Sequence, residues 1–248
     1  LNGGKSESYA IVPDYYNGIL PKVVAKVGEK VKAGSVLMID KNRPEIKFVS
    51  PVSGEVTAVN RGEKRKVLSI VVKPDAQIEY EEFGKKNVAS LQGAEVKEVL
   101  LNAGMWPFIK QRPYDIVAAP LDTPRDIFVS AFYSAPLAPN FDFIVKGQEA
   151  DFQTGLNALA KLTNGKVYVG VRSGSVVSGM KGVEIVEVEG PHPAANVGVQ
   201  INHIKPVNKG EVVWTVNPAD VIVIGRLFNK GVADFSRMVA ITGSETTE

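Results

Sequence analysis

Cysteine is absent from this chain of 248 residues, and histidine occurs only twice, as His192 and His203. Without cysteine the chain cannot form disulfides, thiolate zinc sites or cysteine-ligated iron–sulfur clusters. Two imidazoles without a carboxylate at ligand spacing do not indicate a metal site either. We therefore predict that the chain holds no metal and that each histidine makes a structural hydrogen bond.

Long apolar runs are also missing. No stretch without a charged residue is longer than 127–141, which contains Pro136 and Pro139. Because a membrane-spanning helix needs about 20 apolar residues, we expect no such helix. The chain starts at Leu1 without the charged and apolar segments of a leader peptide, which favours a processed protein or a fragment. The net charge of +2 is too small to indicate a nucleic-acid-binding protein.

Up to Pro74, short runs of β-branched residues alternate with glycine and proline, which is typical of an all-β barrel or sandwich. The stretch up to Asp75 has 13 Lys and Arg against 8 Asp and Glu, whereas the rest has 16 against 19. This change of charge at a proline predicts one domain at 1–74 and a second at 75–248. The runs predict strands at 22–26, 35–39, 45–49, 54–59 and 67–72.

After Pro74 the spacing between apolar residues changes from one typical of strands to one typical of helices. Ser90 is the predicted N-cap of a helix that ends before Gly104, and Pro218 is predicted to start a helix that ends at Gly231. Another helix is predicted at 149–163, with acidic residues in its first turn. Strands alternating with helices predict an α/β domain with a largely parallel sheet. The predicted strands are 115–119, 127–132, 166–172 and 183–188.

The glycine spacing at 27–37, followed by Pro-Val-Ser-Gly-Glu-Val at 51–56, is similar to a biotinyl/lipoyl-type barrel-sandwich hybrid. Carrier domains of that type present a modified lysine at the tip of the hairpin between the two halves. Here the tip is Arg43-Pro44, while Lys41 and Lys47 lie off the apex. We therefore expect neither lipoylation nor biotinylation.

Two aromatic residues and a cation, Trp106, Phe108 and Arg112, directly follow the first predicted helix. Aromatic residues in such a loop can form a ligand or partner surface, although they more often close a core. His192 lies between two prolines, which hold it in a stiff extended segment suited to a positioning role.

The turn at 60–66 contains four cations. Such a run is usually a solvated turn, and the alternative is a docking site for an acidic partner or for anionic headgroups. The chain shows no Ser-His-Asp order, Walker loop or paired-carboxylate motif, and the glycines at 174–182 lack the dinucleotide-binding spacing. We therefore predict no catalytic and no cofactor-binding residue.

Several segments together, in order over residues 9 to about 243, resemble the NqrA subunit of the bacterial Na⁺-translocating NADH:quinone oxidoreductase. Asn-Arg-Gly-Glu-Lys-Arg at 60–65 and Gly-Pro-His-Pro at 190–193 are the most specific. The resemblance implies a fragment that lacks the family's extreme N-terminus and its C-terminal part. The other matching segments are 14–18, 27–34, 112–113, 162–167 and 213–217.

The resemblance implies a peripheral subunit on the cytoplasmic side of the bacterial inner membrane. Its partners would be the other subunits of the complex, especially the membrane subunits, and ubiquinone is a candidate ligand. The complex would couple electron transport from NADH to ubiquinone to the export of Na⁺. NADH, flavins, an iron–sulfur cluster and ubiquinone would be bound in or near other subunits, and the isolated chain would have no activity.

The family is also similar to the flavin-binding subunit of respiratory complex I, whose glycine-rich loop holds the FMN phosphate. Here the corresponding loop, 104–108, keeps one glycine, and Pro107 has no N–H to donate. We therefore predict that the chain binds neither FMN nor NADH. For a quinone or partner surface the candidates are Trp106, Phe108, Arg112 and His192. The alternative is a flavin-binding electron-transfer subunit of a related complex.

Overall fold

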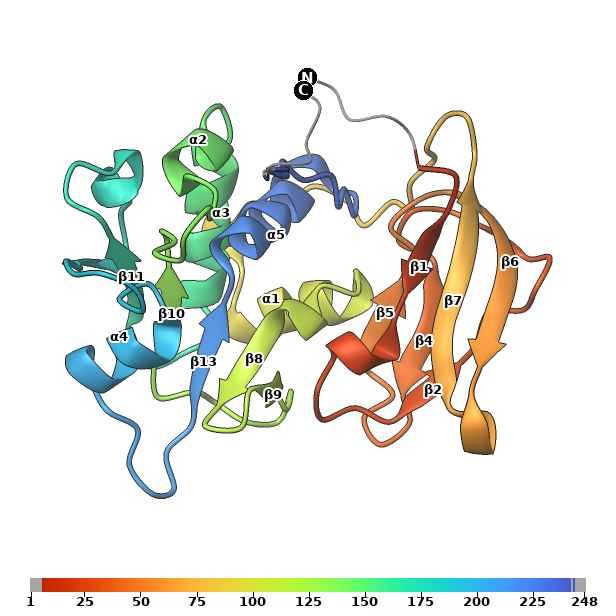
Figure 1. Ribbon diagram of the computed structural model, residues 1–248, viewed down its shortest axis with the longest axis horizontal. Coiled ribbons are helices and arrows are strands. Elements are labelled where there is room, and N and C mark those ends of the chain that lie inside the picture. Colours follow the sequence, from red (N-terminus) through yellow and green to blue (C-terminus); the bar gives the residue numbers. More distant parts are fainter. Residues whose placement is uncertain (1–5, 242, 244–248) are drawn as a thin grey trace.

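Two small antiparallel sheets make up the first part of the computed structural model, which describes residues 6–241 and 243 (Figure 1). One sheet has the strand order β1-β7-β6-β3 and the other the order β2-β4-β5. Side chains from both sheets, among them Met38, Val56 and Ile70, are fully buried in the core. The strands are β1 (Tyr9–Ile11), β2 (Pro21–Val23), β3 (Lys30–Val31), β4 (Val36–Asp40), β5 (Lys47–Val49), β6 (Gly54–Arg61) and β7 (Val67–Pro74).

All five strands predicted in this part are present, as β2, β4, β5, β6 and β7. Two very short strands, β1 and β3, were not predicted, because three or two residues are too few to establish an alternating pattern. The predicted barrel-sandwich architecture of this part is confirmed.

A six-stranded sheet of order β12-β11-β10-β13-β8-β9 organises the second part. The first four strands run parallel, and β8 and β9 are antiparallel additions at one edge. The predicted α/β domain is therefore confirmed. Its sheet is parallel over four strands and antiparallel over the two strands at one edge. The strands are β8 (Ile109–Arg112), β9 (Ile116–Val117), β10 (Ile127–Ser130), β11 (Val167–Val171), β12 (Glu184–Glu187) and β13 (Val213–Val216).

Helices cover both faces of this sheet, and the strand residues alternate accordingly. Phe128 and Val213 pack with Ile201 of α4 on one face. Val129 and Trp214 belong to the main core on the other face. Every residue of β10 and β13 is buried, as expected for central strands between two helical layers. The helices are α1 (Gly93–Asn102), α2 (Phe141–Val145), α3 (Glu149–Ala160), α4 (Val197–Ile204) and α5 (Pro218–Lys230).

Helices α3 and α5 begin where they were predicted, and Gly231 ends α5 in the left-handed conformation with φ of 77°. The prediction of Ser90 as the cap of α1 is wrong. Its hydroxyl donates a hydrogen bond to the Asn87 carbonyl (2.8 Å), and Gln92 caps the helix in a capping box with Glu95. Serine often makes such a local bond instead of capping a helix. Helices α2 and α4 were not predicted.

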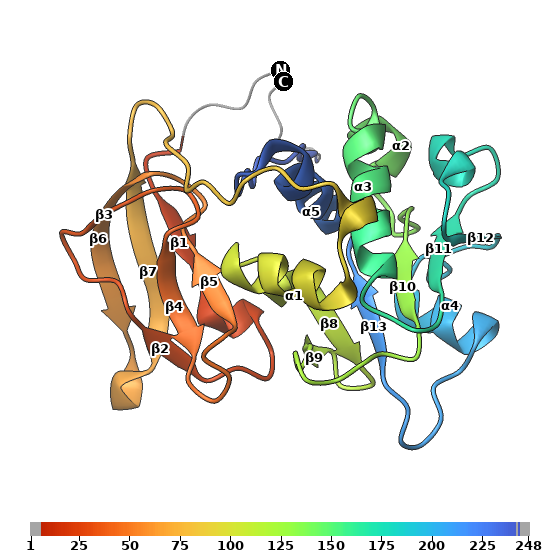
Figure 2. The same ribbon diagram turned by 180° about the vertical axis from the view of Figure 1, so that it is seen from behind.

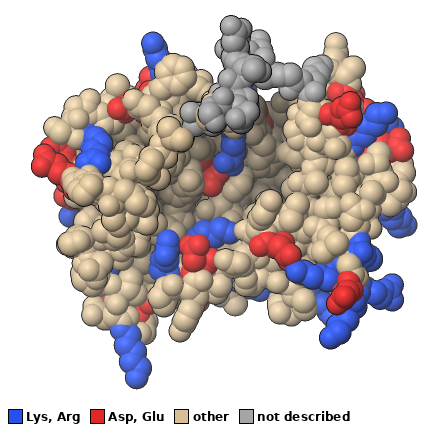
Figure 3. Space-filling model, viewed as in Figure 1, with Lys and Arg blue, Asp and Glu red and all other residues tan. Residues whose placement is uncertain are grey.

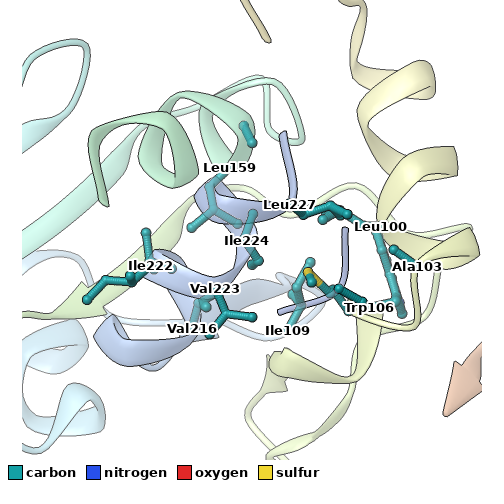
Figure 4. Close-up of a cluster of buried hydrophobic side chains, with 14 of the residues drawn as sticks. Leu100, Ala103, Trp106, Ile109, Leu159, Val216, Ile222, Val223, Ile224 and Leu227 are labelled. Atoms are coloured by element: carbon teal, nitrogen blue, oxygen red, sulfur yellow. The ribbon is translucent and has the colours of Figure 1, made fainter. Parts of the chain in front are cut away.

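The main core gathers apolar side chains from α1, β13, α3 and α5, several of which are labelled in Figure 4. Trp106 is fully buried there, its ring lies edge-on to that of Trp214 at a centroid distance of 5.4 Å, and its indole N–H donates to the Ala118 carbonyl (2.8 Å). Helices α3 and α5 meet at glycines, since a Cβ on Gly225 would lie only 1.7 Å from the Asp151 carbonyl oxygen.

The turn between β4 and β5 contacts the second part of the molecule through Arg43. Its Nη1 donates to the Val117 carbonyl (3.2 Å) and its Nη2 to that of Gly18 (2.8 Å), while its Nε pairs with the buried Asp40 (2.8 Å). The segment at 75–92, seen from behind in Figure 2, runs past the end of α5, where the Phe83 amide donates to the Gly231 carbonyl. The hairpin tip that carries the lysine in carrier domains is here a contact between the two parts.

Candidate functional site

A cleft of about 640 Å³ opens at the carboxyl ends of β10 and β13. From β10 the chain proceeds to β11 and β12 on one side, whereas β13 lies on the other side of β10. The strand order therefore reverses between these two neighbours. In open α/β sheets ligands bind at such a switch point, outside the carboxyl ends of the strands. The topology thus marks this cleft as the candidate site.

Four stretches of chain, far apart in the sequence, line the cleft. Strand β8 and the residues before and after it supply Phe108, Lys110, Arg112 and Asp115. The end of β10 and the residues after it supply Ser130, Phe132 and Tyr133. The remaining walls are the start of α4, at 195–199, and the end of β13 with the first turn of α5, at 215–218 together with Asp220.

Two helix N-termini meet at the cleft. Asn217 caps α5 by accepting a hydrogen bond from the Ala219 amide (3.0 Å), and Pro218 occupies the first position of the helix. Helix α4 starts after Asn196, whose side chain makes no capping bond. The N-terminal end of a helix carries partial positive charge, so both ends add to a lining that holds two cations, Lys110 and Arg112, and two carboxyl groups, Asp115 and Asp220.

Burial shifts the pKa values of two ionisable groups in the cleft lining. Burial raises the pKa of the Asp220 carboxyl above its ordinary value, and the positive charges of Arg237 and Lys110 offset this only in part. Arg237 also hydrogen-bonds Asp220 directly. Burial lowers the pKa of Lys110, whose ammonium lies 5.3 Å from the ring centroid of Tyr16. The neutral form of each buried group is thus favoured relative to the same group in water.

A buried glutamine holds α4 against β10. Gln200 donates from Nε2 to the Ser130 hydroxyl (2.9 Å) and to the Ala194 carbonyl (3.1 Å). A Cβ on Gly170 of β11 would lie 2.2 Å from its Oε1, so only glycine leaves room for this amide. A second hydrogen bond holds the residues just before α4, because the Ser134 hydroxyl accepts from the Ala195 amide (3.0 Å). These bonds give the α4 side of the cleft a defined position.

The structure brings together two of the four residues predicted for a quinone or partner surface. Phe108 and Arg112 both line the cleft, and the Arg112 Nε lies 3.4 Å from Asp115. Trp106 is fully buried beneath them and presents no surface. His192 is exposed outside the cleft lining, with its Nδ1 3.1 Å from the Ser134 hydroxyl.

Sequence reasoning missed Lys110, Asn217, Asp220 and the start of α4 as parts of the site. A signal for two of them was present, because Asn217 and Asp220 frame the proline that begins the last predicted helix, directly after an apolar run. Lys110 gave no such signal. Its proximity to α5 depends on the antiparallel pairing of β8 with β13.

The loop at 104–108, which the sequence analysis compared with a flavin-phosphate loop, is filled by side chains. Met105, Trp106 and Pro107 are buried. The amide of Met105 donates to Leu100 (2.9 Å), and that of Phe108 to Met105 (3.2 Å). A Cβ on Gly104 would meet Val49 of β5 at 2.5 Å, so this glycine serves a close contact within the protein. The loop therefore does not fit an FMN phosphate.

Within residues 6–241, no group of three or more His, Asp or Glu side chains is placed to hold a metal ion. Among the helices of the same residues, none combines the length and apolar character that crossing a membrane requires.

Comparisons with known proteins cover both parts of the chain. The model of the NqrA N-terminal barrel-sandwich hybrid domain matches residues 1–75, and that of the NqrA second alpha/beta domain matches residues 91–233. The NqrA subunit of the Na⁺-translocating NADH-quinone reductase from Hahella chejuensis is 39% identical over 239 residues, which are 94% of this chain and 53% of that protein. The corresponding subunits from Neisseria meningitidis serogroup A and Photorhabdus laumondii are each 37% identical, over 96% and 95% of this chain and 54% of their own lengths. The chain thus spans about half the length of these relatives.

Proposed function

The chain belongs to the NqrA family of Na⁺-translocating NADH-quinone reductase subunits, and we propose that it is a peripheral subunit of such a complex. In this proposal the complex couples NADH oxidation and ubiquinone reduction to Na⁺ export. The chain lies on the cytoplasmic side of the bacterial inner membrane and its partners are the membrane subunits. The observation that carries the proposal is the match of both family models in order along the chain.

In this proposal the chain itself carries neither FMN nor NADH. Support comes from the loop at 104–108, because the amides of Gly104, Met105 and Phe108 already donate to the chain's own carbonyls and the Trp106 ring occupies the core. A phosphate cradle needs several free amides at close approach. The purified chain should therefore show no flavin absorbance and no saturable quenching of NADH fluorescence. Stoichiometric flavin would favour the alternative, a flavin-binding electron-transfer subunit of a related complex.

We further propose that the cleft at β10 and β13 accepts a quinone head group. Its volume lies within the usual range for small-molecule sites, about 300–1,000 Å³. The rings of Phe108 and Tyr133 supply apolar contact, and Arg112 and Lys110 supply N–H donors for the quinone oxygens. Trp106 would act indirectly, by supporting the turn that carries Phe108.

The quinone proposal is tested by labelling with a photoreactive quinone. Phe108→Ala and Arg112→Gln should each reduce labelling, whereas His192→Gln, outside the cleft lining, serves as the matched control. Equal labelling of all variants would remove this cleft from the proposal. It would leave the family assignment intact, because that rests on the match of both domains.

The role within the complex is tested by co-purification. A tagged full-length protein expressed with its membrane partners should retain them, and inverted membrane vesicles that lack it should lose the Na⁺ uptake driven by NADH. Restoration of uptake by the full-length gene completes the experiment. Unimpaired uptake without this protein would contradict the proposal.

A further inference from the structure

The hairpin between β6 and β7 carries a group of cations that the function proposed above does not use. We call Arg61, Lys64, Arg65 and Lys66 the cationic hairpin; all four are exposed. The hairpin tip lies at the lower edge of the molecule in Figure 1. Figure 3 shows a group of Lys and Arg side chains at this edge of the β-rich part.

The turn also contains the exposed Glu63, and a single one of its four cations is paired with an acidic side chain among the described residues. Lys66 pairs with Asp14 (2.6 Å), and Arg61 donates to the Arg65 carbonyl (3.1 Å). Within the described part of the chain, the side chains of Lys64 and Arg65 form no ion pair.

The other end of the same two strands differs. There Lys30 lies 3.5 Å from Glu55 and 3.8 Å from Asp75, and on the adjoining segment Lys32 lies 3.6 Å from Glu79. Lys30 and Lys32 at that end have acidic partners within the chain, whereas Lys66 alone of the four residues in the cationic hairpin has one among the described residues.

The backbone holds the two unpaired cations in an uncommon conformation. Lys64 and Arg65 have φ of 52° and 62°, a region that residues other than glycine rarely adopt. Two hydrogen bonds close the turn, from the Gly62 amide to the Lys66 carbonyl (2.9 Å) and from the Lys66 amide to the Glu63 carbonyl (3.1 Å). Such strain persists where the surrounding structure enforces it, and it concentrates at functional sites.

A second cleft, of about 550 Å³, separates the cationic hairpin from the segment at 13–21. All four cations line it, and Asp14 is the one acidic residue among its lining side chains. The segment at 13–21 also carries exposed apolar groups, because Leu20 of the cleft lining is 46% exposed and Tyr15, next to Asp14 in the sequence, is 79% exposed. Cations beside an exposed tyrosine and leucine are typical of surfaces that lie at a membrane–water interface.

We propose that the cationic hairpin and the segment at 13–21 bind anionic phospholipid headgroups, with the cleft receiving the headgroup phosphate. Arg61, Lys64 and Arg65 would contact phosphate oxygens, while Tyr15 and Leu20 would enter the interfacial layer. The apolar flank favours lipid over an acidic protein, since charge complementarity to a protein would not require it. The proposal depends on the proposed function only for its membrane setting, because binding to lipid needs no other protein.

The test uses the purified chain and sedimentation with vesicles. Vesicles of phosphatidylcholine mixed with phosphatidylglycerol should bind the chain, and vesicles of pure phosphatidylcholine should not. Each Lys or Arg near an anionic surface strengthens binding about fivefold, so Lys64→Gln with Arg65→Gln should weaken the partition coefficient about 25-fold. The matched control is Lys30→Gln with Lys32→Gln, which removes the same charge at the other end of the strands and should change binding by less than about fivefold.

A second readout distinguishes docking from a general loss of charge. Tyr15→Trp should show a blue shift of fluorescence with anionic vesicles, and the Lys64 and Arg65 substitutions should abolish it. No preference for anionic over neutral vesicles would overturn the proposal, as would equal weakening by the two double variants. Salt-sensitive assembly with partner proteins in the absence of vesicle binding would also overturn it, and would assign the hairpin to an acidic protein.

Discussion

Each of the two parts of the molecule has an element that the sequence analysis compared with the group-carrying element of another protein class, and in each part this element makes a structural contact. In the β-rich part, the hairpin tip of a carrier domain is Arg43, which bonds to carbonyls at Gly18 and Val117. In the α/β part, the loop at 104–108, which was compared with a phosphate loop, is filled by Trp106 and its neighbours. The first contact is polar and lies partly at the surface, whereas the second is apolar and lies in the core. Loss of this contact should therefore lower the free energy of unfolding by different amounts in the two parts.

The largest loss of stability is expected from a substitution in the loop at 104–108. Trp106→Ala removes a fully buried ring and the hydrogen bond to Ala118, and should lower the free energy of unfolding by about 3–5 kcal/mol. Trp106→Phe keeps most of the volume and should lose clearly less. Urea unfolding of both variants measures this difference. A small loss in Trp106→Ala would mean that the ring contributes little to the core.

The polar contact of Arg43 should contribute less to the free energy of unfolding than the Trp106 ring does. Arg43→Gln removes the guanidinium from two carbonyls and from the carboxylate of Asp40, which is 1% exposed, and should lower the free energy of unfolding by about 2–3 kcal/mol. Arg43→Lys keeps the charge but not the forked geometry, so it should recover only part of the loss in the same urea experiment. Full recovery in Arg43→Lys would show that charge alone holds the tip.

A buried acidic residue in the α/β part should make stability depend on pH. Burial raises the pKa of Asp126, but hydrogen bonds from Lys205, the Lys166 amide and Arg125 outweigh it and hold the pKa below its ordinary value. The stabilisation is therefore complete above the pKa of the unfolded chain and is lost as pH falls through the folded value.

Asp126→Asn should accordingly flatten the decline of the melting temperature in acid. Glu184→Gln, at a half-exposed pair with Lys166, provides the comparison and should leave the decline nearly unchanged. An identical acid profile for the wild type and Asp126→Asn would contradict this explanation.

The smallest effect on stability is expected at the cationic hairpin. Lys64→Gln with Arg65→Gln should change the free energy of unfolding by no more than about 0.5 kcal/mol, because both side chains are exposed. Differential scanning calorimetry would measure this. A large loss of stability would show that the hairpin has a structural role. Weaker vesicle binding by this variant would then count only if the variant were shown to be folded.

Much of the local structure could be predicted from the sequence. The strand runs before Pro74 and the ends of α5 follow from turn residues, a proline start and a glycine stop. Ser90 was assigned the wrong role because a hydroxyl can cap a helix or bond to the preceding turn, and the sequence does not distinguish these. Helix α4 was missed because Gly198 and β-branched residues give it a weak helical pattern.

The amino-acid sequence by itself determined the absence of cysteine chemistry, the change from β to α/β character after Pro74, the arginine at the hairpin tip and the family. Only the tertiary structure decided that Phe108, Arg112 and Asp220 share one cleft while Trp106 lies in the core. Local patterns record which face of a strand or helix is apolar, because that depends on neighbouring residues. They do not record which strands pair, and it is the pairing of β8 with β13 and of β13 with β10 that brings residues a hundred positions apart to the same edge.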